Sequence, residues 1–111
     1  MKNSEYASFV NSLDFTAKKS FEIGINHHAL SLASEAGEVA GKVVKQYYRE
    51  HQKGYEEFRN KIIDEASDVL YHLVAICNTC GITIDELATY NFAKLSDRVK
   101  RNVLVGEGDN R

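Results

Sequence analysis

EAGE at residues 35–38 and EASD at residues 65–68 are the two stretches around which this sequence is organised. Each places two acidic residues at positions i and i+3, within sequence that has the periodicity of a helix. Residues three apart lie on one helix face, with about 5–6 Å between their Cβ atoms. If the two helices pack antiparallel, four carboxylates converge and repel one another unless a cation lies among them. We therefore expect a divalent cation held by oxygen ligands at this position.

Composition narrows the class of protein. The 111 residues fit one domain, residues 1–111, and 43% are apolar, which leaves room for a second buried face in an oligomer. A net charge of −2 provides no basic field for nucleic acid and no polybasic patch for a membrane. No apolar run approaches the roughly 20 residues that span a bilayer. Residues 1–11 lack a signal-peptide pattern, so we expect a cytoplasmic protein without nucleic-acid or membrane partners.

Secondary structure is predicted to be helical throughout. The chain has no proline, and its apolar residues recur with a 3.6-residue period. The pattern predicts an all-α fold with four main helices, over about residues 5–20, 27–52, 56–80 and 84–101, with a connection at 21–25 and Asn26 as the second N-cap. A capping box begins at Thr83, two residues after Gly81. Because this loop is short, we expect the third and fourth helices to be antiparallel neighbours.

The two cysteines, Cys77 and Cys80, form the only Cys-x-x-Cys in the sequence. One such pair cannot complete a four-ligand zinc site. It also follows an apolar helical run, whereas a reactive thiolate is usually stabilised at a helix start. We therefore expect two small buried helix residues with no redox role.

The third helix distinguishes a metal site from a solvated charged face. In the second helix alone, Glu38 could simply pair with Lys42 on the surface. In the third helix, however, Glu65 falls about 60° from the centre of the apolar stripe by helical periodicity. An acid so close to the core is costly unless it is paired, by Lys61 for example, or bound to a metal. The pattern favours the metal.

The fourth predicted helix carries polar residues along its apolar side. Asn91 lies in the middle of that side, and Lys94 and Arg98 follow one and two turns later. Together they could contact an anion, although long basic side chains also often cover apolar surface with their charges in water. Residues 103–111 are predicted to form a non-helical tail. Its glycines could bind an anion, but a frayed end fits the composition better.

In this order, the segments resemble the MazG-like nucleotide pyrophosphohydrolases, the all-α NTP pyrophosphatases. The motif of that family is E-x-x-E, a spacer and E-x-x-D, which stands here at 35–38 and 65–68. Residues 91–98, NFAKLSDR, resemble the later N-x-x-K-L segment, and the closing GEGDNR resembles the tail of small bacterial or phage-type members. Either acidic pair alone is weak, but the ordered set is a strong match.

The resemblance implies an antiparallel helical bundle completed by oligomerisation into a homodimer or homotetramer. It also implies Mg²⁺-dependent hydrolysis of (d)NTPs between the α- and β-phosphates, with Mn²⁺ as an alternative ion. One acid would activate water, with Glu38 preferred and Glu35 as the other catalytic candidate. The implied metal ligands are Glu35, Glu38, Glu65 and Asp68, and the candidate substrate contacts are Asn91, Lys94, Arg98, Lys42, His72 and Arg111.

Other functions stay open at this stage. Within enzymes, the chain could be a narrower dUTP, dCTP or phosphoribosyl-ATP pyrophosphohydrolase. His27, His28 and His72 could line the rim of a nucleoside groove, although each taken singly is more typical of a structural histidine. A di-iron carboxylate bundle would require Glu-x-x-His pairs, which the chain lacks. A non-enzymatic helical dimerisation module predicts no Mg²⁺ dependence and gives no reason for Glu65 to lie near the core.

Overall fold

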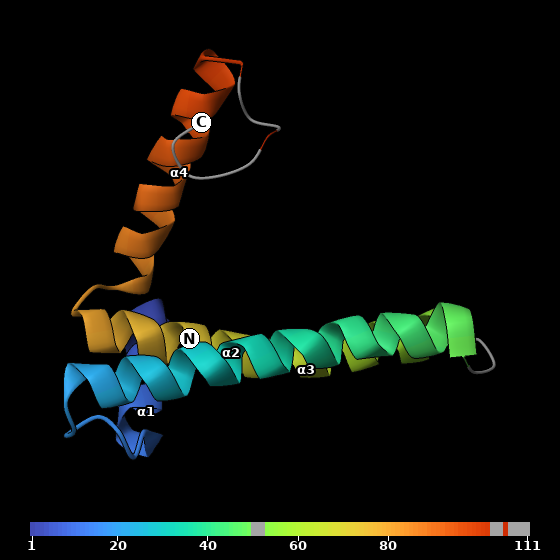
Figure 1. Ribbon diagram of the computed structural model, residues 1–111, viewed down its shortest axis with the longest axis horizontal. Helices are drawn as coiled ribbons and strands as arrows, with labels where there is room; N and C mark the ends of the chain where they lie inside the picture. The colour runs from blue at the N-terminus through green and yellow to red at the C-terminus, as the bar shows by residue number, and fades with distance from the viewer. Residues whose placement is uncertain (50–52, 103–105, 107–111) are drawn as a thin grey trace.

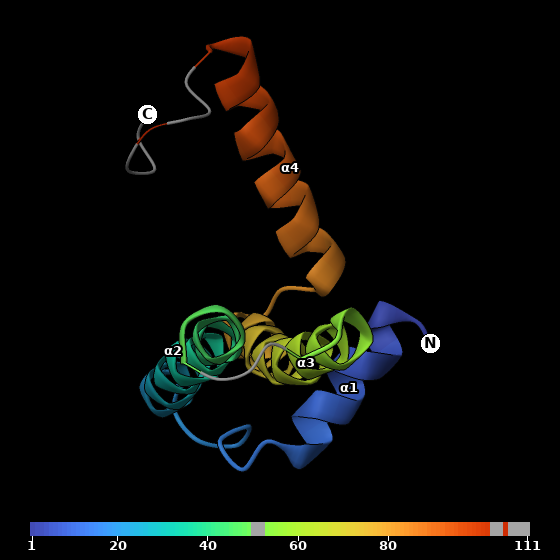
Figure 2. The ribbon, with the colours of Figure 1, turned by 90° about the vertical axis from the view of Figure 1, so that its right-hand side faces the viewer.

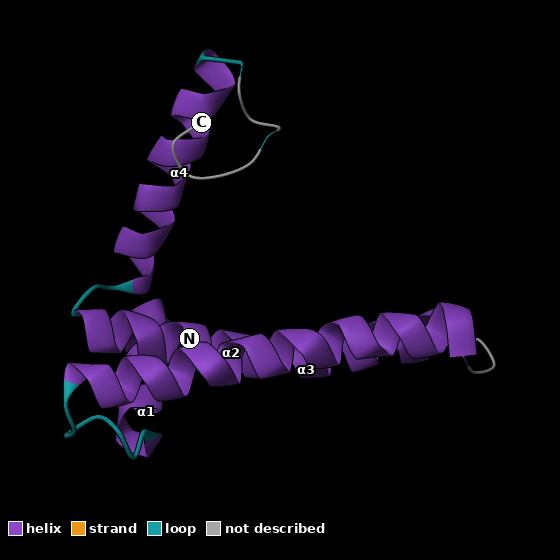
Figure 3. Ribbon diagram, viewed as in Figure 1, coloured by secondary structure: helices purple, strands orange, loops and turns teal. Residues whose placement is uncertain are grey.

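The computed structural model describes residues 1–49, 53–102 and 106. This part of the chain is helical and contains no strand (Figure 3). The prediction of an all-α fold with four main helices is confirmed. The predicted tail, residues 103–111, lies outside the described residues apart from Gly106. The helices are α1 (Asn3–Leu13), α2 (Phe21–Val44), α3 (Tyr55–Cys80) and α4 (Ile84–Lys100), and a π-helical turn, η1 (Lys45–Arg49), continues α2.

The boundary between α1 and α2 differs from the prediction. The first helix ends at Leu13, well before residue 20, and the second begins at Phe21. Ser20 is its N-cap, since the serine hydroxyl accepts a hydrogen bond from the backbone N–H of Ile23 at 3.3 Å. The predicted connection at 21–25 and the predicted cap at Asn26 are therefore wrong. A capping hydroxyl followed by an acidic first turn starts the helix six residues earlier.

α2 and α3 form a long antiparallel pair that is the main body of the molecule (Figure 1). The half-buried side chains of α2 recur at residues 32, 35, 39 and 42, which is the spacing of a single helix face. On α3 the half-buried residues include 58, 61, 62, 65 and 69. We call the contact between these faces the α2–α3 seam. The seam includes charged residues, and the alanine face of α2 (29, 33, 36 and 40) is exposed.

The hydrophobic core is small and lies where α1 crosses the C-terminal half of α3 (Figure 2). Val10 of α1 packs with Val74 and Ala75 of α3. Cys77 is also buried, whereas Cys80 is exposed, and both are free thiols. The expectation that both cysteines are buried is therefore right only for Cys77.

α4 departs from the rest of the molecule. α3 ends at Gly81, whose φ of 70° suits glycine, and the capping box that joins Thr83 and Glu86 starts α4 as predicted. The axes of α3 and α4 are bent by 95°, so the expectation of antiparallel neighbours is wrong (Figure 1). The glycine and the cap together make this sharp corner.

Much apolar surface of the described chain stays exposed. Phe92 and Val99 of α4 are 73% and 60% exposed, and Leu30 of α2 is 74% exposed. The radius of gyration is 16.9 Å, whereas a compact chain of this length has about 13 Å. No single described helix is both long and apolar enough to cross a membrane; only α3 and α4 together, as a bent pair, meet that length and composition.

Candidate functional site

Three of the four predicted acidic ligands come together in the α2–α3 seam. Glu35 of α2 and Glu65 and Asp68 of α3 each offer a carboxylate oxygen, and these oxygens lie within 4.8 Å of one another. We call these three residues the acidic centre. Antiparallel packing creates it, because the i, i+3 pair on α3 faces one turn of α2. Glu35 and Glu65 are half-buried and Asp68 is exposed, so the centre opens to solvent.

Electrostatics show that negative charge predominates around Glu35 in the acidic centre. Partial burial raises the pKa of Glu35 above its ordinary value, and the negative charges of Asp68 and Glu65 raise it further. Glu38, one turn along α2, adds a smaller effect in the same direction. A bound cation would reverse these contributions, since it favours the ionised carboxylates.

Lys42 is the cation that the described structure places beside this centre. Its Nζ lies 3.5 Å from Oε1 of Glu65, and both side chains are mostly buried. From the sequence, Glu38 was a candidate partner for Lys42, and Lys61 was a candidate partner for Glu65. The structure instead joins the two helices, because Lys42 lies on the α2 face that packs against α3.

The remaining predicted site residues lie elsewhere. Glu38 is exposed, and Asn91, Lys94 and Arg98 lie on α4. Asp68 is twelve residues before Cys80, or about 18 Å along α3, and α4 then turns away by 95°. The chain therefore does not bring its own α4 residues to its own acidic centre. Arg98 is buried, Lys94 lies 5.6 Å from the ring centre of Tyr90, and Arg111 is outside the described residues.

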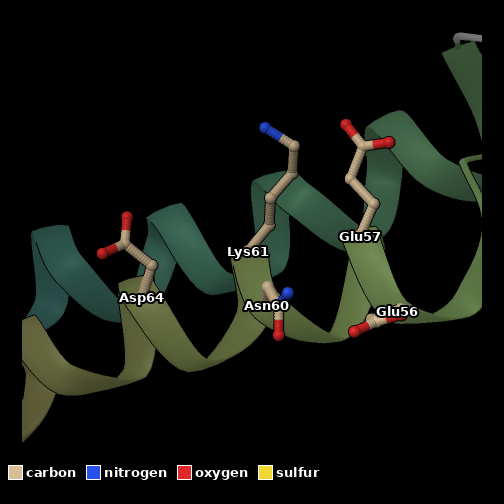
Figure 4. Close-up of a pocket in the computed structure, with 5 residues that line it drawn as sticks. All are labelled: Glu56, Glu57, Asn60, Lys61 and Asp64. Atoms are coloured by element: carbon tan, nitrogen blue, oxygen red, sulfur yellow. The ribbon is translucent and has the colours of Figure 1, made fainter.

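The first turns of α3 carry a separate charged surface. Glu56, Glu57, Asn60, Lys61 and Asp64 line a shallow hollow there, and all five come from α3 (Figure 4). Glu57 forms an ion pair with Lys53, at 3.3 Å. These exposed carboxylates share a helix with the acidic centre but are not part of the cluster, so they provide matched controls for it.

A second polar cluster lies one turn further along α3. Asp14 and Thr16 of the α1–α2 loop, His27 and His28 of α2, and His72 of α3 form it, and we call it the histidine centre. His28 is 1% exposed; its Nε2 lies 2.8 Å from Oδ2 of Asp14, and its Nδ1 lies 3.0 Å from Nδ1 of His72.

Thr16 fixes the carboxylate of this centre. Its backbone N–H and its hydroxyl both donate to Oδ1 of Asp14, at 2.8 and 2.7 Å. Burial alone would raise the pKa of Asp14, but the hydrogen bonds from Thr16 and the contact with His28 outweigh it and hold the pKa below its usual value. Asp14 is therefore a buried carboxylate at neutral pH.

Sequence reasoning missed the role of Asp14 and Thr16. Both residues were assigned to a continuous first helix, so nothing pointed them toward a histidine. The available signal was the Asp-x-Thr spacing at 14–16, which is typical of a turn in which an aspartate accepts hydrogen bonds from the residue two positions later. This turn ends α1 and places the carboxylate beside α2.

Comparison with known proteins gives two matches. The family model described as the MazG nucleotide pyrophosphohydrolase domain matches residues 25–103. The Gene 37 protein of Mycobacterium phage L5 is 31% identical over 88 residues, which cover 79% of this chain and 77% of that protein. No solved structure gives a significant match. The matched region includes both acidic stretches and α4, and Asp14 and Thr16 precede it.

Proposed function

The chain belongs to the MazG nucleotide pyrophosphohydrolase family, and from this premise we propose that it hydrolyses nucleoside triphosphates between the α- and β-phosphates in a Mg²⁺-dependent reaction. The products would be a nucleoside monophosphate and pyrophosphate. The observation that carries the proposal is the acidic centre, where two helices bring three carboxylate oxygens within 4.8 Å of one another. A helical dimerisation module would have no use for this arrangement.

The residues of the acidic centre fit a hard divalent cation. Mg²⁺ and Mn²⁺ prefer carboxylate and water oxygens, and three carboxylates with one open side leave room for water or phosphate oxygens. Partial burial and then repulsion from the neighbouring carboxylates raise the pKa of Glu35, so added positive charge would favour its ionised form. When bound, the ion would neutralise negative charge on the phosphate chain. Glu35, Glu65 and Asp68 would hold it.

Other side chains would serve the substrate and the water. Lys42 lies at the centre and could move from Glu65 to a phosphate oxygen, because both are anionic partners for its ammonium group. Glu38 is exposed one turn away from Glu35, where it could accept a proton from the attacking water. The proposal assigns Glu38 as general base and Lys42 as a phosphate contact.

The phosphate contacts of α4 would come from a second copy of the chain. Asn91 and Lys94 are turned away from the acidic centre of their own chain by the 95° corner. An apolar groove along α4, lined by Phe92, Leu95 and Val99 among others, stays open to a partner. A homodimer would bury this groove and the alanine face of α2, and it would allow one chain to complete the site of the other.

The test of the reaction is a substrate panel with a matched pair of variants. The standard and several modified (d)NTPs are incubated with and without Mg²⁺, and the products are separated by anion-exchange chromatography. We expect monophosphate and pyrophosphate, with activity about 100-fold or more lower in Glu65→Gln and unchanged in Glu56→Gln, an exposed acid of the same helix. The panel also distinguishes a broad enzyme from a dUTP, dCTP or phosphoribosyl-ATP enzyme. Loss of activity in both variants, or no turnover by folded protein, would contradict the proposal.

The dimer is tested by mixing two inactive variants. Lys94→Ala and Glu65→Gln damage different parts of the proposed shared site, so a mixed dimer retains one intact combination. We expect activity to return when the two proteins are exchanged together, and a dimer mass in sedimentation equilibrium. A monomeric protein, or no recovery after proven subunit exchange, would show that α4 does not act on a partner.

A further inference from the structure

The histidine centre has a geometry that its role in packing does not explain. The three imidazoles each offer a ring nitrogen, and these nitrogens lie within 4.8 Å of one another. They come from two helices, and the carboxylate behind them comes from a loop outside the matched family region. The centre is therefore separate from the acidic ligands, although His72 follows Asp68 by only one turn of α3.

Hydrogen bonding fixes which nitrogen of His28 is available. Asp14 is a carboxylate that can only accept, so Nε2 of His28 must carry the proton. In the neutral ring, Nδ1 then has its lone pair free, and it faces Nδ1 of His72 at 3.0 Å. Two lone pairs cannot face each other at this distance. One of the two rings therefore donates a proton into the gap, either His72 or a protonated His28, or a cation occupies it.

We propose that His27, His28 and His72 form a binding site for a zinc-class divalent ion, with Asp14 as the carboxylate that orients His28. Neutral imidazole is a preferred ligand of Zn²⁺ and a poor one for Mg²⁺. A carboxylate on the far nitrogen of a metal-binding histidine is a recurring arrangement, since it fixes both ring orientation and tautomer. In this protein Thr16 in turn fixes the carboxylate with two hydrogen bonds.

The distances suit this ion. Two nitrogens bound to one tetrahedral Zn²⁺ are about 3.3 Å apart, and the facing atoms of His28 and His72 are 3.0 Å apart. The side chain of His27 is half-buried and its ring contacts that of His28 edge-on, with centroids 4.8 Å apart, so a nitrogen of this ring lies close to the other two. A water molecule would complete four-coordination, because His27 and His72 are not fully enclosed.

Protonation favours binding at neutral pH. Burial lowers the pKa of His72, and the neighbouring His28 and His27 lower it further. The ring is therefore neutral, and binding requires only that its proton move from Nδ1 to Nε2, with no net change in ring charge. The ion would join α2 and α3 directly and the α1–α2 loop through Asp14, so it would stabilise the fold beside the acidic centre.

The test is a metal titration of the full chain after treatment with a chelator. Zn²⁺ affinity is measured by competition with a chromophoric chelator, and Co²⁺ is used as a spectroscopic substitute because tetrahedral Co²⁺ absorbs visible light. We expect one Zn²⁺ per chain, not displaced by excess Mg²⁺, and a Zn²⁺-dependent rise in Tm. His72→Gln should abolish the Co²⁺ band, and Asp14→Asn should weaken Zn²⁺ binding about 10- to 100-fold. Glu65→Gln, in the acidic centre, should change neither.

Several results would overturn the proposal. If wild-type protein binds no Zn²⁺, the contact between His28 and His72 is a plain hydrogen bond. If Glu65→Gln removes binding while His72→Gln preserves it, the ion sits in the acidic centre. If His72→Gln fails to fold, His27→Gln replaces it, since this residue lies at the edge of the cluster. Unchanged Zn²⁺ affinity and Co²⁺ spectrum in that variant would exclude His27 as a ligand and reject the three-histidine site.

Discussion

The acidic centre and the histidine centre lie in the same α2–α3 seam, one turn of α3 apart, yet their polar groups are supported differently. The carboxylates of the acidic centre lie close together, and partial burial followed by their mutual repulsion raises the pKa of Glu35. In the histidine centre, both oxygens of Asp14 and both nitrogens of His28 have hydrogen-bond partners. The first centre is prepared for a ligand at a cost in stability, and the second contributes stability before any ligand binds.

This difference predicts that removing a carboxylate charge changes the stability of the protein in opposite directions in the two centres. Removing the negative charge of Glu35 relieves repulsion, so the metal-free protein becomes more stable. Removing the negative charge of Asp14 leaves a buried histidine without its partner, so the protein becomes less stable.

The largest effect is expected for Asp14→Ala. This variant leaves Nε2–H of the buried His28 and the hydroxyl of Thr16 without their acceptor, and it should lower the free energy of unfolding by about 2–4 kcal/mol. Urea unfolding followed by circular dichroism measures the loss. Asp97→Ala is the control, because Asp97 is 61% exposed and pairs with Arg101 at the surface; it should cost less than about 1 kcal/mol. Equal losses in the two variants would contradict a special role for Asp14.

A smaller effect is expected on acidification of the metal-free protein. Because the folded-state pKa of Asp14 lies below its unfolded value, its stabilising contribution is complete above the unfolded value of about 4 and is lost as the pH falls through the folded pKa. Urea unfolding at a series of pH values below 5 should therefore show that the free energy of unfolding falls more steeply with decreasing pH in wild type than in Asp14→Asn. Parallel curves would mean that Asp14 has the same pKa in the folded and unfolded states.

The two centres also differ in how far the sequence predicts them. The acidic centre follows from helical periodicity, because Glu65 and Asp68 are neighbours on one turn of α3. Antiparallel packing of α2 against α3 is then enough to add Glu35. The histidine centre requires a loop at residues 14–20. The apolar spacing of the sequence hides this loop, because Ala17 falls on the same helical face as the apolar residues of α1 although it lies outside that helix. The hydrogen bonds between Asp14 and Thr16 end the helix there, and helical periodicity in the sequence takes no account of such bonds.

The orientation of α4 could not be predicted for a different reason. Its capping box and the glycine before it are clear in the sequence, and both were predicted correctly. A short loop keeps the ends of the two helices close together. It does not determine the angle between them, which depends on the surface available for packing. In this chain α4 makes few contacts with α1 and α3, and its residues Phe92 and Val99 stay exposed. The sequence pattern of α4 therefore predicts where the helix starts but not its direction.

The smallest effect, and the one that tests the contrast most directly, is expected for Glu35→Gln. The folded-state pKa of Glu35 is raised, so its ionisation at neutral pH lowers stability, and this penalty disappears as the pH falls through the raised pKa. In EDTA at pH 7 and low salt, Glu35→Gln should melt slightly above wild type, and the difference should shrink in acid and in high salt, which screens the repulsion. Added Mg²⁺ should reverse the order, because an ion bound to the acidic centre stabilises wild type and binds the variant less well. Differential scanning calorimetry with and without Mg²⁺ measures the melting temperatures of wild type and variant under both conditions. A variant that is less stable than wild type in EDTA would show that Glu35 is held by favourable contacts, and the acidic centre would then resemble the histidine centre.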